Sequence, residues 1–148
     1  MKFLIIQKSF ATALIAFSLV VLCSCHRKFA NGEEASPEII IITQSDSTSG
    51  KLTLRDANGN SADTFKVKKG RKIQWLLIAK ETATDLTNIY KKDSSVEVFS
   101  RLPHRLGTSA NWEGRVSTDA EGRTEDYNIE WTDLSGDKHT FDPKIQVQ

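Results

Sequence analysis

The sequence predicts an all-β domain folded as an antiparallel sandwich of two sheets. Apolar residues recur at every second position, residues typical of turns separate these short runs, and helical spacing of apolar residues is almost absent. Closely spaced short strands favour two packed sheets over a single sheet, because each strand then buries one of its faces.

The first predicted strand spans residues 38–43 and contains four consecutive isoleucines, which is consistent with burial on both faces. Leu52 and Leu54 lie on the second predicted strand. The Asn58-Gly59 dipeptide is typical of a tight turn and leads to the third.

The clearest alternation of apolar and polar residues lies between positions 65 and 77. A Lys69-Gly70 turn separates two strands there, and the predicted inward-facing residues are Phe65, Val67, Ile73, Trp75 and Leu77. Residues 79–85 are compatible with one helical turn.

The remaining strands are shorter or less regular. They are predicted around Ile89 and Tyr90, at 96–99, at 112–117 paired with 127–131 across a Glu121-Gly122 turn, in a hairpin through Ser135-Gly136 to residue 141, and at 144–147. Pro143 has no amide hydrogen for a sheet, so Asp142-Pro143 is predicted to mark an edge, a bulge or a crossover.

The N-terminus has the pattern of an export signal. Lys2 and Lys8 supply positive charge, and residues 10–22 form an uncharged apolar run that is shorter than the roughly 20 residues of a membrane-spanning helix. A basic stretch, residues 26–28, follows directly, which further disfavours a permanent membrane span.

The next four residues, Leu22-Cys23-Ser24-Cys25, resemble the lipobox of bacterial lipoproteins. The resemblance implies that the signal is cut before Cys25, that its thiol forms a thioether to diacylglycerol, and that the new amino group receives a further acyl chain such as palmitate. Several acyl chains anchor a protein stably where one does not. The alternatives are an ordinary cleaved signal with two incidental cysteines, or Cys23 as the acceptor.

Three segments follow from this assignment: a lipoprotein signal peptide at residues 1–24, a lipidated flexible tether at 25–37 and a β-sandwich domain at 38–148. His26 stands where an inner-membrane retention signal would have aspartate, so outer-membrane placement is expected. Whether the domain faces the periplasm or the outside stays open.

Composition excludes several functional classes. Both cysteines lie at the signal junction, so the folded part has no disulfide, thiol nucleophile or thiolate metal site. The first 24 residues include two lysines and no acid, which leaves 18 basic and 19 acidic residues and a net charge of −1. This balance argues against nucleic acid as a partner.

Two stretches resemble cupredoxins, the copper-binding Greek-key sandwiches. Residues 65–75 are similar to their two strands joined by a V-x-x-G-x-x-V-x-W pattern, and Tyr127-Asn-Ile129 with Ile145-Gln-Val147 is similar to their final hairpin. The resemblance implies a cupredoxin-like fold, and an immunoglobulin-like sandwich is the alternative. A blue-copper site needs two histidines and a cysteine, usually with an axial methionine. Residues 38–148 contain no cysteine and no methionine, no histidine follows the strand through Trp75, and His139 is the only residue in the loop after Tyr127 that could bind copper strongly, so the resemblance does not extend to electron transfer.

A second resemblance is to a group of uncharacterised lipid-anchored proteins, and it brings no active site. It rests on Leu102-Pro103, Trp112-Glu113-Gly114, Tyr127 and Asp142-Pro143-Lys144-Ile145.

His104 and His139, with Asp142, are candidates for a metal site, although two histidines at unrelated positions are more often surface residues. Residues 56–60 are similar to a calcium loop, but their glycine is fourth instead of sixth, which favours a hairpin turn. A serine, histidine and aspartate triad would be assembled only by folding.

Three further groups have a functional and a structural interpretation. Paired carboxylates for glycoside chemistry would come from Asp119, Glu121, Glu125, Asp126 and Glu130, but a solvated hairpin explains them better. A sugar-stacking platform would use Trp75, Trp112, Trp131, Tyr90 and Tyr127, most of which are expected in the core. An anionic glycan or lipid headgroup would contact Lys66, Lys68, Lys69, Arg71 and Lys72, which otherwise form a solvated face.

By elimination, the sequence predicts a lipid-anchored envelope protein that acts as a noncatalytic binding or assembly module. It is expected to have no cofactor, no metal and no enzymatic activity, and to contact the membrane through Cys25 and an envelope protein or glycan through its loops. The alternative is an envelope hydrolase with a site built from loops near His104 or His139.

Overall fold

A computed structural model of the protein describes residues 35–148 as an all-β sandwich. This part of the chain contains ten strands: β1 (Glu38–Asp46), β2 (Lys51–Asp56), β3 (Thr64–Val67), β4 (Lys72–Leu77), β5 (Ala83–Lys91), β6 (Phe99–Arg105), β7 (Trp112–Val116), β8 (Thr124–Asp133), β9 (Lys138–Phe141) and β10 (Lys144–Val147). Within these residues no helix is long and apolar enough to cross a membrane.

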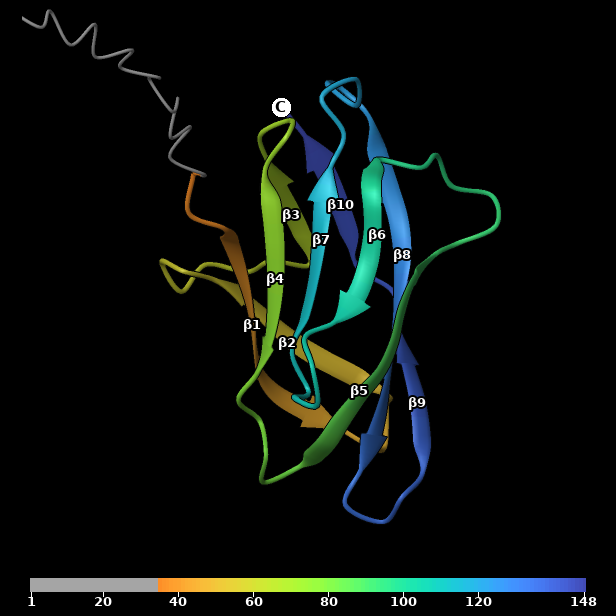
Figure 1. The fold of residues 1–148 in the computed structure, drawn as a ribbon. Helices are drawn as coiled ribbons and strands as arrows, with labels where there is room; N and C mark the ends of the chain where they lie inside the picture. Colours follow the sequence, from red (N-terminus) through yellow and green to blue (C-terminus); the bar gives the residue numbers. More distant parts are fainter. Residues whose placement is uncertain (1–34) are drawn as a thin grey trace, which may run out of the picture. The chain divides into compact units, whose positions relative to one another are not determined.

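The strands form two five-stranded sheets. The first sheet has the order β2-β1-β4-β7-β6, and the second has the order β3-β10-β8-β5, with β9 beside β8. In Figure 1, β4, β7 and β6 of the first sheet lie in front of β3 and β10 of the second. The two-sheet sandwich predicted from the alternation is confirmed.

The sheets are mixed, because two strand pairs are parallel where the prediction was an antiparallel sandwich. β1 runs parallel to β4, with Glu38 opposite Ile73, and β3 runs parallel to β10, with Thr64 opposite Lys144. A tight turn forces consecutive strands to be antiparallel, but strands far apart in the sequence can pair in either direction. The spacing of turns therefore could not specify these two pairings.

The core contains the residues that the alternation placed inward. Trp75, Tyr127 and Trp131 are completely or almost completely buried between the sheets. The Trp75 indole Nε1 donates a hydrogen bond to the Tyr127 hydroxyl at 3.1 Å, which joins β4 of the first sheet to β8 of the second.

Two details of the second half of the chain differ from prediction. Strand β7 pairs with β4 and β6, so it does not pair with β8; residues 117–123 carry the chain across to the other sheet. The strand predicted at 96–99 begins only at Phe99, because the Val98 amide donates to the Glu125 carboxylate at 2.7 Å instead of to a strand.

The end of the chain follows one of the predicted options. β9 and β10 both pair with β8, one after the other, and Asp142-Pro143 breaks the ladder between them. Earlier in the chain, the carbonyl of Ala79 accepts hydrogen bonds from the amides of Thr82 and Ala83, which makes a single turn before β5. Residues 79–85 are therefore part turn and part strand.

The two ends of the sandwich differ in the connections they contain. We call the end at which β1 begins the proximal end; there Arg71 of the β3–β4 turn donates to the Ser36 carbonyl at 2.6 Å. The distal end consists of the β1–β2 turn (47–50), the β4–β5 loop (78–82), the β6–β7 turn (106–111) and the β8–β9 turn (134–137). These four connections lie at the lower side of Figure 1.

Candidate functional site

A surface groove of about 680 Å³ lies at the distal end of the sandwich. It lies between the end of β1, the start of β2 and the β4–β5 loop. Its lining is Thr43, Gln44, Ser45, Asp46, Lys51, Thr53, Ile78, Ala79, Glu81 and Thr82. A continuation reaches the β8–β9 turn at Asp133, Leu134 and Ser135. We call this combined surface the distal groove.

The distal groove is built mainly from groups that hydrogen-bond. Ser45 Oγ donates to Thr82 Oγ1 at 2.6 Å, and this bond links β1 to the β4–β5 loop across the groove. The remaining lining consists of further hydroxyls, an amide, three carboxylates, one ammonium group and the apolar side chains of Ile78, Ala79 and Leu134. Such a surface can bind a polar partner, and its lining groups are held on the ends of β1 and β2 and on the loops beside them.

Two turns share one design, and one of them borders the groove. Asp56 and Asp133 each end a strand, and their Oδ1 atoms accept the amides two and four residues later at 2.8–3.0 Å. In both turns the third residue after the aspartate is a glycine with positive φ, +85° at Gly59 and +87° at Gly136. The calcium-loop similarity at residues 56–60 is therefore explained by a hairpin turn, as predicted.

His139 lies beside the distal groove and contributes to the same turn. Its Nε2 is 3.0 Å from Asp133 Oδ2, and its ring stacks on Trp131 with centroids 4.4 Å apart. The hydrogen bond from His139, with those from the Asp137 and Ser135 amides, holds the pKa of Asp133 below its usual value. In the part of the chain that the structure describes, no hydroxyl is hydrogen-bonded to His139, so a nucleophile is not positioned against it.

The structure does not bring the predicted metal ligands together. His104 lies on β6 in the first sheet, with Nδ1 3.1 Å from the Leu102 carbonyl, whereas His139 lies on β9 beside the second sheet. Asp142 pairs with Lys92 at 2.6 Å. Across residues 35–148, no three histidine, cysteine, aspartate or glutamate side chains are grouped so that they could hold a metal ion.

Glu125 corrects the interpretation of the carboxylates as a solvated hairpin, because it is buried, with 1% of its surface exposed. Its Oε2 accepts the Val98 amide at 2.7 Å. Burial raises the pKa of Glu125 to about 7, and the neighbouring carboxylate of Glu97 adds to the rise. The signal was in the sequence, since Glu125 is in phase with Tyr127 and Ile129 on β8.

The aromatic residues do not form a sugar-stacking platform. Trp75, Trp112, Trp131 and Tyr127 are buried, as predicted for core residues. Tyr90 is exposed on β5, where its hydroxyl is 3.1 Å from Glu130 Oε1. A single exposed tyrosine offers little area to a glycan ring.

The basic run at the proximal end is largely neutralised. Lys69 pairs with Glu121, Arg71 pairs with Glu38, and Lys72 lies 3.7 Å from Glu113. Lys66 and Lys68 are exposed. Because three of the five cations face carboxylates, the run has little excess charge with which to attract an anionic polymer.

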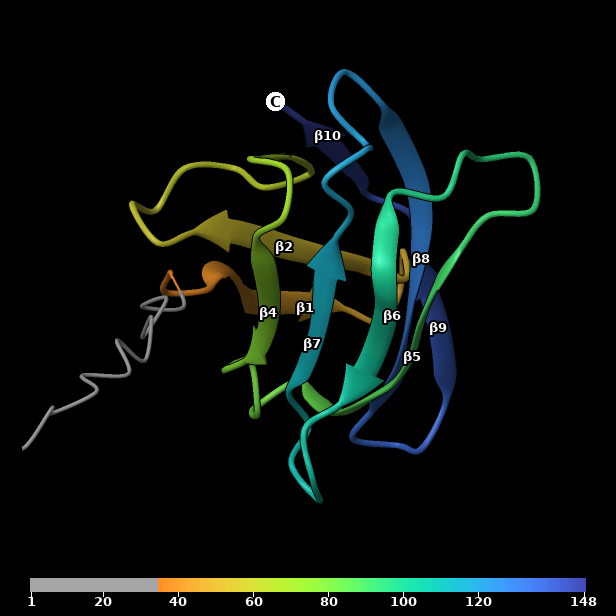
Figure 2. The same ribbon diagram turned by 45° about the horizontal axis from the view of Figure 1, so that its top comes forward.

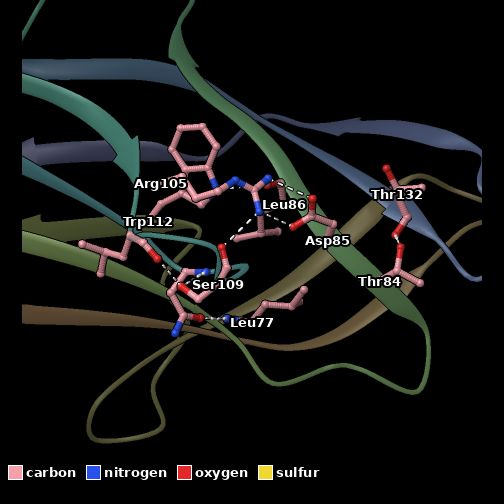
Figure 3. Close-up of polar contacts among 10 residues, drawn as sticks. Leu77, Thr84, Asp85, Leu86, Arg105, Ser109, Trp112 and Thr132 are labelled. Atoms are coloured by element: carbon pink, nitrogen blue, oxygen red, sulfur yellow. Dashed lines mark hydrogen bonds and ion pairs between the residues drawn. The ribbon is translucent and has the colours of Figure 1, made fainter.

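Sequence reasoning missed a cluster around Arg105, shown in Figure 3. Its guanidinium binds both carboxylate oxygens of Asp85 and donates to the carbonyls of Leu86 and Ser109. It also lies 5.6 Å from the centre of the Trp112 ring. The residues are far apart in the chain and follow no local pattern, so no sequence signal identified them.

Cys25, the predicted lipidation site, lies outside the described residues, as do the signal peptide at 1–24 and most of the tether. No protein-family model matches the chain, and no curated protein matches it. The fold and the groove alone define the class of the protein, which is a β-sandwich with a polar groove at one end.

Proposed function

We propose that this protein is a noncatalytic binding or assembly module of the cell envelope. It is anchored by a lipid on Cys25 and binds its partner with the distal groove. The observation that carries the proposal is the position of the groove, at the end of the sandwich opposite the start of β1. The partner is an envelope protein or glycan, and the anchoring membrane is the outer membrane.

The geometry of β1 supports this arrangement. The strand spans nine residues, or about 30 Å at roughly 3.3 Å per residue, and separates the tether from the groove. The tether of residues 25–37 reaches roughly 45 Å when extended. The lipid would then hold the proximal end near the bilayer and leave the groove unobstructed.

The mechanism is confinement. A lipid anchor restricts the domain to the vicinity of a membrane, which raises the effective concentration of a weak binding surface near a partner in the same envelope. A polar groove without a deep enclosed pocket suits such weak contacts.

The alternative, a hydrolase near His104 or His139, has one observation in its favour: the 3.0 Å contact between His139 and Asp133. The Asp133 carboxylate is also occupied by two turn amides, which explains the pair as a structural element. We therefore expect His139→Ala and His104→Ala to leave the cellular function intact. Loss of function with a retained fold would support the hydrolase instead.

The proposal is tested by crosslinking in intact cells. A photoreactive residue in place of Thr82 lies inside the groove, and the same residue in place of Gln146, which is exposed on β10, is the matched control. We expect a discrete adduct from position 82 that position 146 does not give, and its loss in a Cys25→Ala background. Equal adducts from both positions, or none from position 82, would contradict the proposal.

A further inference from the structure

Leu134 is an exposed aliphatic residue that its turn does not require. The turns after Asp56 and Asp133 have the same hydrogen bonds and the same glycine position, yet the residue after the aspartate is Ala57 in one and Leu134 in the other. Leu134 is 64% exposed. Since alanine serves in the twin turn, the larger side chain needs a different explanation.

A second exposed aliphatic residue lies on the same surface. Ile78 follows β4, is 59% exposed and lines the distal groove, while Leu134 lines its continuation at the β8–β9 turn. These two side chains add apolar contact area to a lining that is otherwise rich in hydrogen-bonding groups, and protein interfaces combine apolar and polar contacts in this way.

The charge between these two apolar side chains, which we call the anchors, is negative. Asp46, Glu81 and Asp133 line the groove together with one cation, Lys51. The two aspartates are held in place by their own turns, since Asp46 accepts the Thr48 amide at 3.0 Å. Glu81 is exposed on the loop between the anchors. Asp133 already faces His139, so the exposed carboxylates of Asp46 and Glu81 are the ones that favour a partner with positive charge.

None of the side chains that line the distal groove is aromatic. Glycan rings usually rest their apolar face on an aromatic side chain, so this lining favours a polypeptide over a glycan. The negative charge and the exposed aliphatic side chains also favour a polypeptide partner.

We propose that the distal groove binds a protein segment that places a lysine or arginine between apolar side chains, with Ile78 and Leu134 as apolar anchors and Glu81 as a charge partner. This inference rests on the proposed function and narrows its partner to one class. It predicts contacts whose strength falls with added salt, because Asp46 and Glu81 are exposed to solvent.

The test uses the full-length protein purified in detergent, with a phage-displayed library of random short peptides as the probe. We expect enriched peptides to carry lysine or arginine beside apolar residues. Their affinity should fall about tenfold or more with Leu134→Ala and Ile78→Ala combined, and also with Glu81→Lys. Leu134→Ala places alanine where the matching turn after Asp56 has Ala57, so we expect the fold to be retained. Leu102→Ala removes an equally exposed leucine on β6 and is the matched control.

An acidic or uncharged consensus, or affinities that the combined variant does not change, would overturn the inference. Failure to enrich any peptide over the combined variant would overturn it as well. The proposed function is tested separately by crosslinking: a glycan adduct from position 82 in cells would support the binding module and refute only the protein partner.

Discussion

Arg105 and Asp85 join the two sheets through a forked ion pair, with Nη1–Oδ1 and Nη2–Oδ2 distances of 2.7 and 2.9 Å. Arg105 is the last residue of β6, an edge strand of the first sheet, and Asp85 lies on β5, an edge strand of the second. The pair therefore closes one open side of the sandwich near the distal end (Figures 2 and 3).

Removal of this fork should destabilise the domain. Arg105→Ala is expected to lower the free energy of unfolding by about 1–3 kcal/mol, because the Leu86 and Ser109 carbonyls lose a donor and the Trp112 ring loses its cover. The half-exposed charges alone would contribute less. Arg105→Lys should recover only part of the loss, since an ammonium cannot fork. Urea unfolding measures this, and a loss no larger than that of the exposed Arg101→Ala would contradict it.

Glu125 should make stability depend on pH near neutrality. Its pKa is about 7 in the folded chain and 4.5 ordinarily. Because the folded state favours the protonated form, the contribution to stability is complete below pH 4.5 and is lost as pH rises through about 7. We expect the free energy of unfolding to fall by an amount on the order of 3 kcal/mol across this window.

Two variants test the assignment to Glu125. Glu125→Gln keeps an oxygen that can accept the Val98 amide and should remove the pH dependence. Glu97→Gln should lower the pKa of Glu125 and shift the window to lower pH, because the nearby carboxylate contributes to the rise. Denaturant titrations at several pH values report both effects. An unchanged pH profile in Glu125→Gln would assign the dependence to another group.

The hydrogen bond from Trp75 to Tyr127 gives a prediction about the core. Tyr127→Phe leaves the buried Trp75 Nε1–H without its acceptor, and we expect a loss of about 1–3 kcal/mol in the free energy of unfolding. Tyr90→Phe removes an exposed hydroxyl and should have little effect. Equal losses in the two variants would mean that the buried bond contributes nothing specific.

Asp133 should matter more to the fold than His139. Asp133→Ala removes the acceptor of two turn amides and of His139, whereas His139→Ala removes one of these three bonds. The lowered pKa of Asp133 means that its stabilisation is present above the ordinary value of 3.8 and is lost as pH falls through the folded value. Thermal unfolding at neutral and acidic pH compares the variants, and a larger effect of His139→Ala would refute the order.

The core was predictable because it is a local property. A period of two places every second residue on one face, and Ile73, Trp75, Leu77, Tyr127, Ile129 and Trp131 are buried accordingly. The same rule would have placed Glu125 and Asp133 inward, since both are in phase with Ile129 on β8. The polarity of Glu125 led the sequence interpretation to place this residue on a solvated hairpin, against the periodicity.

Pairing and the distal groove were not predictable in the same way. The parallel pairs β1–β4 and β3–β10, and the separation of β7 from β8, depend on how distant strands meet. The groove is made by connections that only this topology brings to one end, so Ser45 and Thr82 become neighbours although 37 positions separate them. The sequence around Ser45 or Thr82 has no local pattern that would predict this contact.

The anchor is tested most directly by mass spectrometry of the N-terminal peptide of the native protein. We predict a mature chain that begins at Cys25 and carries the mass of a diacylglycerol thioether with a further acyl group. Recovery of an unmodified peptide that spans residues 23–25, or of an unacylated N-terminus elsewhere, would contradict a membrane-anchored module.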